Sequence, residues 1–242
     1  MAARPRRLSV TEVETWIRDP YAIFARHVLA LRPLDPLDED PSAMDLGTAV
    51  HRALDRFIAA YPHAMPGDAL ARLLAIGRDC FAALPARPAI GAFWWPRFER
   101  MAHWFVHEFE PDRRRDGYVT LATAVSGNLR LPGPMGAFEL VAKADRIDRM
   151  ADGALAILDY KTGALPSAKA VEMGLAPQLP LEAAMALAGG FTGIASAKVG
   201  ELGFVRLTGH DPAGEWKPLH KVQAAELGQA ARAGLERLIA VY

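Results

Sequence analysis

The spacing of apolar residues changes from helical to strand-like at Arg113-Arg114-Arg115, near the middle of this chain of 242 residues. Before that point the apolar residues recur every three or four positions, which is typical of amphipathic helices. After it they alternate or run continuously in short segments between Pro-Gly and Asp-Gly pairs, which is typical of strands. Helices that precede a set of strands can pack on the sheet they form, so the pattern predicts an α/β fold.

The expected elements divide into two parts. Helices are expected from the capping box of Ser9 and Glu12, from Pro20, and over Ser42–Tyr61, Asp68–Leu84 and Gly91–Glu110, with a Pro-rich break over 32–41. Strands are expected at Tyr118–Ser126, Ala137–Met150, Ala154–Tyr160 and Ala197–Leu207, and helices at Gln178–Ala188 and Lys221–Val241. We expect one domain, 1–242, with a mainly helical part over 1–115 and an α/β core over 116–242. Its mixed sheet is flanked by helices.

Composition limits the classes of partner. The 28 basic and 28 acidic residues cancel, so any nucleic acid must be bound by a local patch. No run of about 18 apolar residues and no secretory leader occurs, which predicts a cytoplasmic protein without a membrane partner. Cys80 is the one cysteine, and it cannot complete an internal disulfide or hold an iron-sulfur cluster. No nucleotide-binding glycine motif is present.

The segment from Asp145 to Gly163 carries the candidate chemistry. Asp159 and Lys161 are two positions apart, so they share one face of a strand. A three-residue hairpin loop at 151–153, with Gly153 at a positive φ, would place Asp145 opposite Asp159. A two-residue loop would instead put the two carboxylates on opposite faces. The hairpin register therefore decides whether these residues form one site.

Two adjacent carboxylates repel each other unless a cation lies between them. Mg²⁺ or Mn²⁺ is bound by such oxygen ligands, and with Lys161 nearby the set suits phosphodiester hydrolysis. A structural ion pair at a sheet edge is the alternative interpretation of an isolated Asp-x-Lys pair.

The full segment, Asp145-x-x-Asp followed by Leu-Asp159-Tyr-Lys161-Thr-Gly163, resembles the nuclease motif of the PD-(D/E)XK superfamily in its RecB-like branch. Within that branch it is most similar to the C-terminal nuclease domain of AddB subunits. The resemblance implies a restriction-endonuclease-like fold, catalytic residues Asp145, Asp159 and Lys161, and Mg²⁺ as cofactor, with Mn²⁺ possible. It also implies that the Tyr160 carbonyl is a further metal ligand.

Two other segments extend the resemblance. Gly47-x-x-x-His51 resembles the helical motif whose histidine is a metal ligand, although position alone favours a packed or solvent-facing histidine. Gln178 resembles the family's glutamine, which helps to position the lysine, the metal-bound water or DNA. Glu182 occupies a position where relatives often have tyrosine, and Asp19 one where many have a cluster cysteine. Family members continue beyond the position of Tyr242, so we expect an excised or truncated domain.

Several basic residues are candidates for contacts with DNA phosphates, although solvated charge is the default for each: Lys143, Arg146, Arg149, Arg113, Arg114 and Arg115. A separate set of aromatic residues, Trp94, Trp95, Phe98 and Trp104, recurs at helical spacing. That spacing favours core positions, with base stacking as the alternative.

The resemblance implies a metal-dependent DNA exonuclease domain that trims ends in recombinational double-strand-break repair. Its expected partners are DNA, an AddA-like helicase-nuclease subunit and a helicase-like remainder of the same chain. A stand-alone RecB-like exonuclease of the CRISPR-adaptation type would keep the same site. A non-catalytic DNA-binding scaffold would have little reason to keep both aspartates and the lysine.

Overall fold

The computed structural model describes residues 4–32, 34, 42–84, 90–219 and 223–241. Its helices are α1 Val10–Arg18, α2 Pro20–His27, α3 Ala43–Ala60, α4 Ala69–Ala82, α5 Trp95–Trp104, α6 Glu110–Arg115, α7 Ala168–Glu172, α8 Gln178–Leu187 and α9 Ala224–Ala240. Short π-helical segments, η1 Ile90–Trp94 and η2 Phe105–Phe109, flank α5. The strands are β1 Arg7–Ser9, β2 Val119–Leu131, β3 Phe138–Arg149, β4 Leu155–Lys161, β5 Val199–Leu207 and β6 Gly214–Pro218.

The strands form one mixed sheet of six, with β3 at its junction. β2 runs antiparallel along the length of β3, whereas β4 and β1 pair with opposite halves of it, at 146–149 and 139–141. β4 then pairs in parallel with β5, and β5 antiparallel with β6. The stretch of β3 between its pairings with β4 and β1 contains Asp145, so the sheet opens at that residue.

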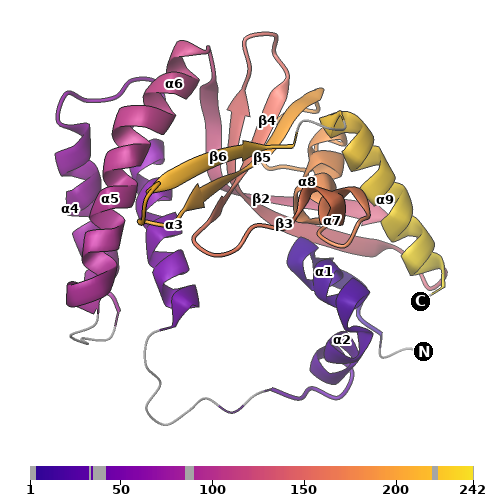
Figure 1. Cartoon of the computed structure of the whole chain (residues 1–242). Coiled ribbons are helices and arrows are strands. Elements are labelled where there is room, and N and C mark those ends of the chain that lie inside the picture. The colour runs from indigo at the N-terminus through magenta and orange to yellow at the C-terminus, as the bar shows by residue number, and fades with distance from the viewer. Residues whose placement is uncertain (1–3, 33, 35–41, 85–89, 220–222, 242) are drawn as a thin grey trace.

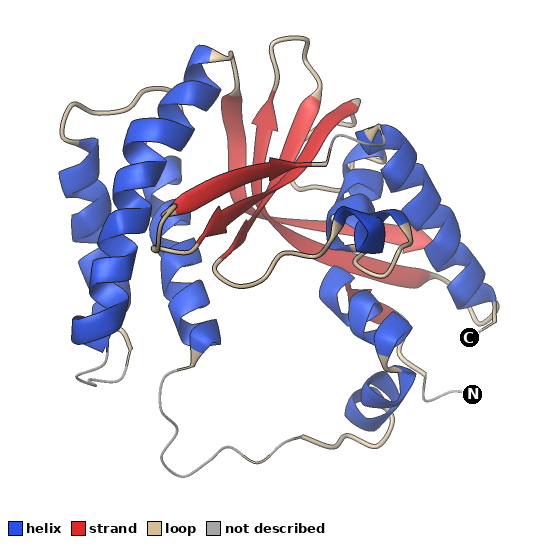
Figure 2. Ribbon diagram, in the orientation of Figure 1, coloured by secondary structure: helices blue, strands red, loops and turns tan. Residues whose placement is uncertain are grey.

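Helices cover the sheet in two groups (Figure 1). The first group, α3 to α5 with η2, packs on the face that carries Leu158 and Tyr160. The second group, α1, α8 and α9, packs on the face that carries Leu155 and Ile157. Figure 2 shows the sheet between the two groups. The fold class predicted from the sequence is therefore confirmed.

The β3–β4 hairpin has the register of the three-residue loop. The main-chain N–H of Met150 donates to the carbonyl of Ala154 at 2.8 Å, and Gly153 has a φ of +84°. Arg146 then pairs with Leu158, which makes Asp145 and Asp159 the next pair outward. A two-residue loop, which would separate the carboxylates, is excluded.

Most predicted elements are present, and three short ones went unpredicted. β1, β6 and α7 have three to five residues each, too few to show a period. β2 also continues five residues beyond Ser126, to Leu131, and the predicted helix at 91–110 continues to Arg115. The predicted helix start at Lys221 and most of the Pro-rich break lie outside the described residues.

The capping box of Ser9 and Glu12 forms as predicted at the start of α1. The aromatic residues at helical spacing are core residues. Phe98 is fully buried against Phe81, and Trp94, Trp95 and Trp104 pack on the same cluster. Base stacking is therefore not needed to explain them. In the described residues no helix combines the length and apolar character needed to cross a membrane.

Candidate active site

Asp145 is held at the point where β3 and β4 separate. Its Oδ2 accepts a hydrogen bond of 2.8 Å from the main-chain N–H of Tyr160, and its side chain is 22% exposed. Across β3 on the other side, Ala124 of β2 has a φ of +45°, a left-handed conformation that costs an alanine about 1 kcal/mol or more. Such local strain is typical of functional sites, and here it falls directly opposite Asp145.

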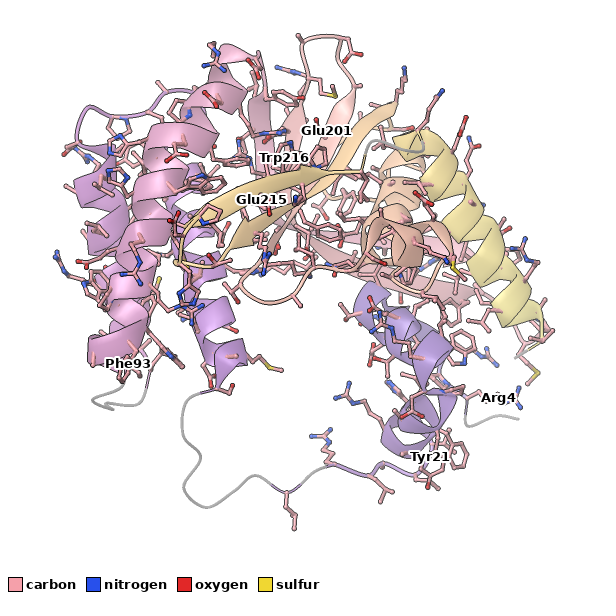
Figure 3. All side chains as sticks on the ribbon, in the orientation of Figure 1. Arg4, Tyr21, Phe93, Glu201, Glu215 and Trp216 are labelled. Atoms are coloured by element: carbon pink, nitrogen blue, oxygen red, sulfur yellow. The ribbon has the colours of Figure 1, made fainter. Side chains whose placement is uncertain are left out.

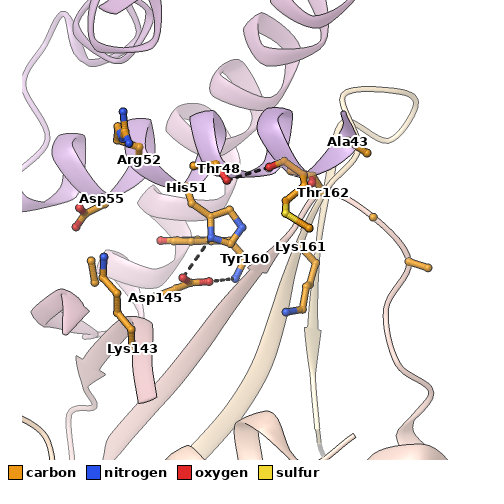
Figure 4. A pocket seen from close by; sticks show the side chains of 15 residues that line it. Ala43, Thr48, His51, Arg52, Asp55, Lys143, Asp145, Tyr160, Lys161 and Thr162 are labelled. Atoms are coloured by element: carbon orange, nitrogen blue, oxygen red, sulfur yellow. Dashed lines mark hydrogen bonds and ion pairs between the residues drawn. The ribbon is translucent and has the colours of Figure 1, made fainter. Parts of the chain in front are cut away.

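His51 reaches Asp145 from α3. Its Nδ1 lies 3.2 Å from Oδ1 of Asp145, and its ring meets that of Tyr160 edge-on at a centroid distance of 5.8 Å. One turn earlier, a Cβ at Gly47 would lie 3.2 Å from Oγ1 of Thr162, closer than ordinary packing. The glycine therefore lets α3 approach the end of β4. The Gly-x-x-x-His spacing brings the histidine to the first aspartate, as Figure 4 shows.

Asp159, Lys161 and Gln178 form a connected set. Nζ of Lys161 lies 2.7 Å from Oδ2 of Asp159 and donates to Oε1 of Gln178 at 3.1 Å. Nε2 of Gln178, in turn, donates to Oδ1 of Asp159 at 2.6 Å. Gln178 is the first residue of α8, so that helix meets the end of β4 from the face opposite α3. Every residue predicted for catalysis therefore lies at this one end of β4.

The electrostatics of the site reflect packed carboxylates. Burial and the charge of Asp145 raise the pKa of Asp159 to about 6, although neighbouring Lys161 opposes the shift. Burial acts to lower the pKa of Lys161, but the carboxylates of Asp159 and Asp145 outweigh it and raise that pKa, so the ammonium stays charged. Burial likewise opposes protonation of His51, while the hydrogen bond and charge of Asp145 prevail and raise its pKa.

A cavity of about 570 Å³ opens onto these residues. His51, Asp145 and Lys161 line it (Figure 4), and its rim carries the basic side chains of Arg52 and Lys143. A hollow whose lining combines cationic side chains with the carboxylate of Asp145 can hold a phosphodiester close to a cation. Arg52 is a lining residue that the sequence reasoning missed, although its place next to His51 was a usable signal.

Two of the six arginines and lysines predicted to contact DNA are buried, and for them the structure contradicts that role. Arg146 is 1% exposed and Arg113 is 5% exposed. Arg146 donates to Glu110 and Asp148, each at 2.6 Å, and Arg113 donates to Asp148 at 3.0 Å. A guanidinium enclosed by carboxylates has no surface to offer a phosphate. The reason is strand alternation, which turns Arg146 to the face opposite Asp145.

The other four basic residues lie at or near the surface. Lys143 and Arg149 are exposed, but only Lys143 lines the cavity, since Arg149 lies at the hairpin end of β3. Arg114 is mostly buried, and it donates to Glu110 and to the carbonyl of Tyr61. Arg115 is 70% exposed and pairs with Asp112. Of the six, Lys143 is best placed to contact a substrate in the cavity.

The residues at the end of β4 fit a hard divalent cation by their chemistry. Two carboxylates, an imidazole and a backbone carbonyl are ligands that Mg²⁺ and Mn²⁺ accept. The raised pKa of Asp159 is the physical sign of repulsion and desolvation that a cation would relieve. Within the described ranges, no three His, Cys, Asp or Glu side chains already converge as a metal cluster. Asp159 is instead paired with Lys161.

Comparison with known proteins agrees with this arrangement. The model of the PD-(D/E)XK nuclease superfamily matches residues 7–240, and the chain belongs to that family. Nucleases of this superfamily generally use divalent metal ions such as Mg²⁺. Membership in this superfamily therefore supports a nuclease, and the fold described above agrees with it.

The chain is similar to uncharacterized proteins of Rickettsia bellii (strain RML369-C) and Rickettsia conorii (strain ATCC VR-613 / Malish 7). They are 32% identical over 187 and 192 residues, which cover 77% and 78% of this chain. The chain spans about a fifth of their length, 22% and 23%. The solved structure of SSO0001 aligns over 93% of this chain and 85% of its own at 13% identity, but its TM-score is only 0.33. A TM-score this low says nothing about the function of this chain.

Proposed function

We propose that this chain is a Mg²⁺-dependent DNA exonuclease domain that hydrolyses phosphodiester bonds at DNA ends, in a cytoplasmic AddB-like subunit of double-strand-break repair. The connected set of Asp159, Lys161 and Gln178, next to Asp145 in a cavity that Arg52 and Lys143 also line, supports the proposal most directly. An AddA-like helicase-nuclease subunit and a helicase-like remainder are its proposed partners. The long Rickettsia relatives are consistent with a nuclease segment joined to other parts.

In this proposal Asp145, Asp159, His51 and the Tyr160 carbonyl hold the cation. A bound Mg²⁺ supplies charge that favours formation of a nucleophile from water near neutral pH and offsets charge on the phosphate. Lys161, kept protonated by its carboxylate neighbours, donates to the attacking water or to a phosphate oxygen. Gln178 holds Lys161 beside Asp159. Lys143 contacts a phosphate at the cavity rim.

The test is cleavage of end-labelled linear and closed circular DNA, single- and double-stranded, by the full chain with Mg²⁺, Mn²⁺ or EDTA. We expect linear DNA alone to be degraded, only with a divalent cation, and Asp159→Asn to abolish degradation with the fold intact. Cleavage of circular DNA would contradict the exonuclease assignment. Absence of cleavage by the wild type, alone and with a helicase partner, would instead favour a DNA-binding scaffold. Full activity and stability without any partner would favour a stand-alone exonuclease.

A further inference from the structure

Glu182 is a buried acid next to the candidate site. It lies one turn after Gln178 on α8 and is 1% exposed. Its Oε1 accepts a long hydrogen bond of 3.4 Å from Nε2 of Gln178, while its Oε2 is buried with no hydrogen-bond partner in the structure. An apolar side chain would fill such a position without leaving a polar atom unpaired. The buried carboxyl therefore lowers the stability of the fold. Its hydrogen bond with Gln178 indicates where its role lies.

The amide of Gln178 has a single favourable orientation among its three neighbours. Nε2 faces two acceptors, Oδ1 of Asp159 and Oε1 of Glu182, and Oε1 faces one donor, Nζ of Lys161. Rotation of the amide by half a turn would place its oxygen against two carboxyl oxygens and its NH₂ group against an ammonium. Both hydrogens of Nε2 are used only when Glu182 supplies the second acceptor.

We propose that Glu182 is a positioning residue: its carboxyl fixes the amide orientation of Gln178 and thereby the place of Lys161 beside Asp159. The activity part of this inference rests on the proposed nuclease function. Burial, with the charges of Asp159 and Asp145, raises the pKa of Glu182 well above its usual value.

The first test compares Glu182→Met with Glu182→Gln in the full chain. Met removes the acceptor at similar size, whereas Gln keeps a carbonyl oxygen. We expect Glu182→Met to lower kcat about five- to tenfold, the effect of one lost hydrogen bond, with KM for DNA within about twofold. Its Tm should stay the same or rise, because a buried unpaired oxygen is gone. Glu182→Gln should restore most of the lost rate.

Coupling to Gln178 separates positioning from a merely structural role. In a Gln178→Ala background, Glu182→Met should lower kcat by no more than about twofold, since the group it orients is absent. Independent multiplication of the two losses would overturn the proposal. Unchanged activity of Glu182→Met, or a loss that follows a drop in Tm, would overturn it as well.

A second readout does not depend on cleavage. In the metal-free ¹⁵N-labelled chain, the side-chain NH₂ signals of Gln178, assigned by their loss in Gln178→Ala, should show two protons protected from exchange. Glu182→Met should remove the protection of one, and Glu182→Gln should keep both. Identical signals in the wild type and Glu182→Met would overturn the proposal. If the wild type cleaves no DNA, the proposed function fails while this readout still judges the role of Glu182.

Discussion

The two faces of the β3–β4 hairpin carry charged residues in opposite circumstances. On one face Asp145 lines a cavity, and the next carboxylate, Asp159, has a pKa that burial and the charge of Asp145 raise to about 6. On the other face Arg146 and Asp148 are buried and paired with each other at 2.6 Å. Adjacent residues of β3 thus lie in two different environments. Asp145 lines a cavity that can accept a ligand, whereas Arg146 belongs to a buried network of ion pairs that does not bind one.

The buried network joins the helical layer to the sheet. Glu110 of α6 is fully buried against Arg146, and Arg113 links Asp148 to Glu201 of β5 at 3.1 Å. The guanidinium of Arg113 also lies over the ring of Tyr118 at 3.8 Å and 5.1 Å from that of Trp216. Glu201 and Trp216 are labelled in Figure 3. A charge enclosed in this way is costly unless its partners remain, so the network specifies how α6 sits on the hairpin.

The largest expected effect is on the face of the hairpin that carries Asp145 and Asp159, which we call the open face. Lys161→Ala should lower the rate of DNA cleavage by about 10³-fold, because it removes the ammonium that stabilises charge at the reacting phosphate. Its Tm is measured as well, because Lys161 is the ion-pair partner of buried Asp159 at 2.7 Å, and the rate is referred to the folded fraction. The matched control is Lys169→Ala, an exposed lysine on α7. Equal rates for the two variants, measured with excess Mg²⁺, would assign the chemistry to other residues.

The opposite face, which carries Arg146 and Asp148 and which we call the closed face, should show an effect on stability. Arg146→Met removes one of the two arginines that pair with each of the buried carboxylates Glu110 and Asp148, so the free energy of unfolding should fall by about 3–5 kcal/mol. Urea denaturation measures the loss. Arg115→Ala, which breaks only exposed pairs with Asp112 and Asp116, should change stability far less. Similar losses in both variants would contradict a structural role specific to the network.

A pH dependence should distinguish the open face further. Asp159 titrates near 6 in the folded chain and near 3.8 when unfolded, so the folded state holds the proton more tightly. The stability it contributes is therefore complete below pH 4 and is lost as pH rises to about 6, by about 3 kcal/mol. Asp159→Asn should remove this part of the decline in urea denaturation between pH 4 and pH 6.5, while the part that comes from Glu182, whose pKa burial also raises, should remain. An equal decline in the variant would place the titration elsewhere.

The smallest effect is expected at the cavity rim. Lys143→Ala should raise KM for DNA by about three- to tenfold with kcat nearly unchanged, because it removes one phosphate contact. The dependence of binding on salt should weaken by about one counterion. Arg149→Ala, from the exposed far end of the same strand, is the control. Equal changes in the two variants would mean that DNA extends along the hairpin rather than into the cavity.

Sequence reasoning identified the hairpin and the Asp159–Lys161 pair from local spacing, whereas Gln178 and His51 followed from the family resemblance. The spacing left two hairpin registers open, and the structure has the one with Gly153 at a positive φ, which places Asp145 opposite Asp159. What sequence reasoning could not supply was the environment of the alternating residues. In the sequence, Arg146 looks like any arginine that could bind a phosphate. Its contact with Glu110, 36 positions away in the sequence, shows that it lies in the interior.

The same limit applies to Glu182 and Ala124. Glu182 was singled out only because relatives often have tyrosine at that position, and its hydrogen bond with Gln178 and its burial depend on how α8 packs on the sheet. The positive φ of Ala124 has no signature in the sequence, because alanine rarely adopts it and the cross-strand position opposite Asp145 imposes it.

The central claim is that the two faces of this hairpin divide catalysis from stability, and the isosteric pair Asp145→Asn and Asp148→Asn tests it most directly. Cleavage of linear DNA and urea denaturation are measured on both variants of the full chain. The account predicts that Asp145→Asn loses cleavage with stability nearly unchanged, whereas Asp148→Asn loses stability and the molecules that remain folded still cleave. Loss of cleavage in Asp148→Asn at full stability, or retained cleavage in Asp145→Asn, would contradict it.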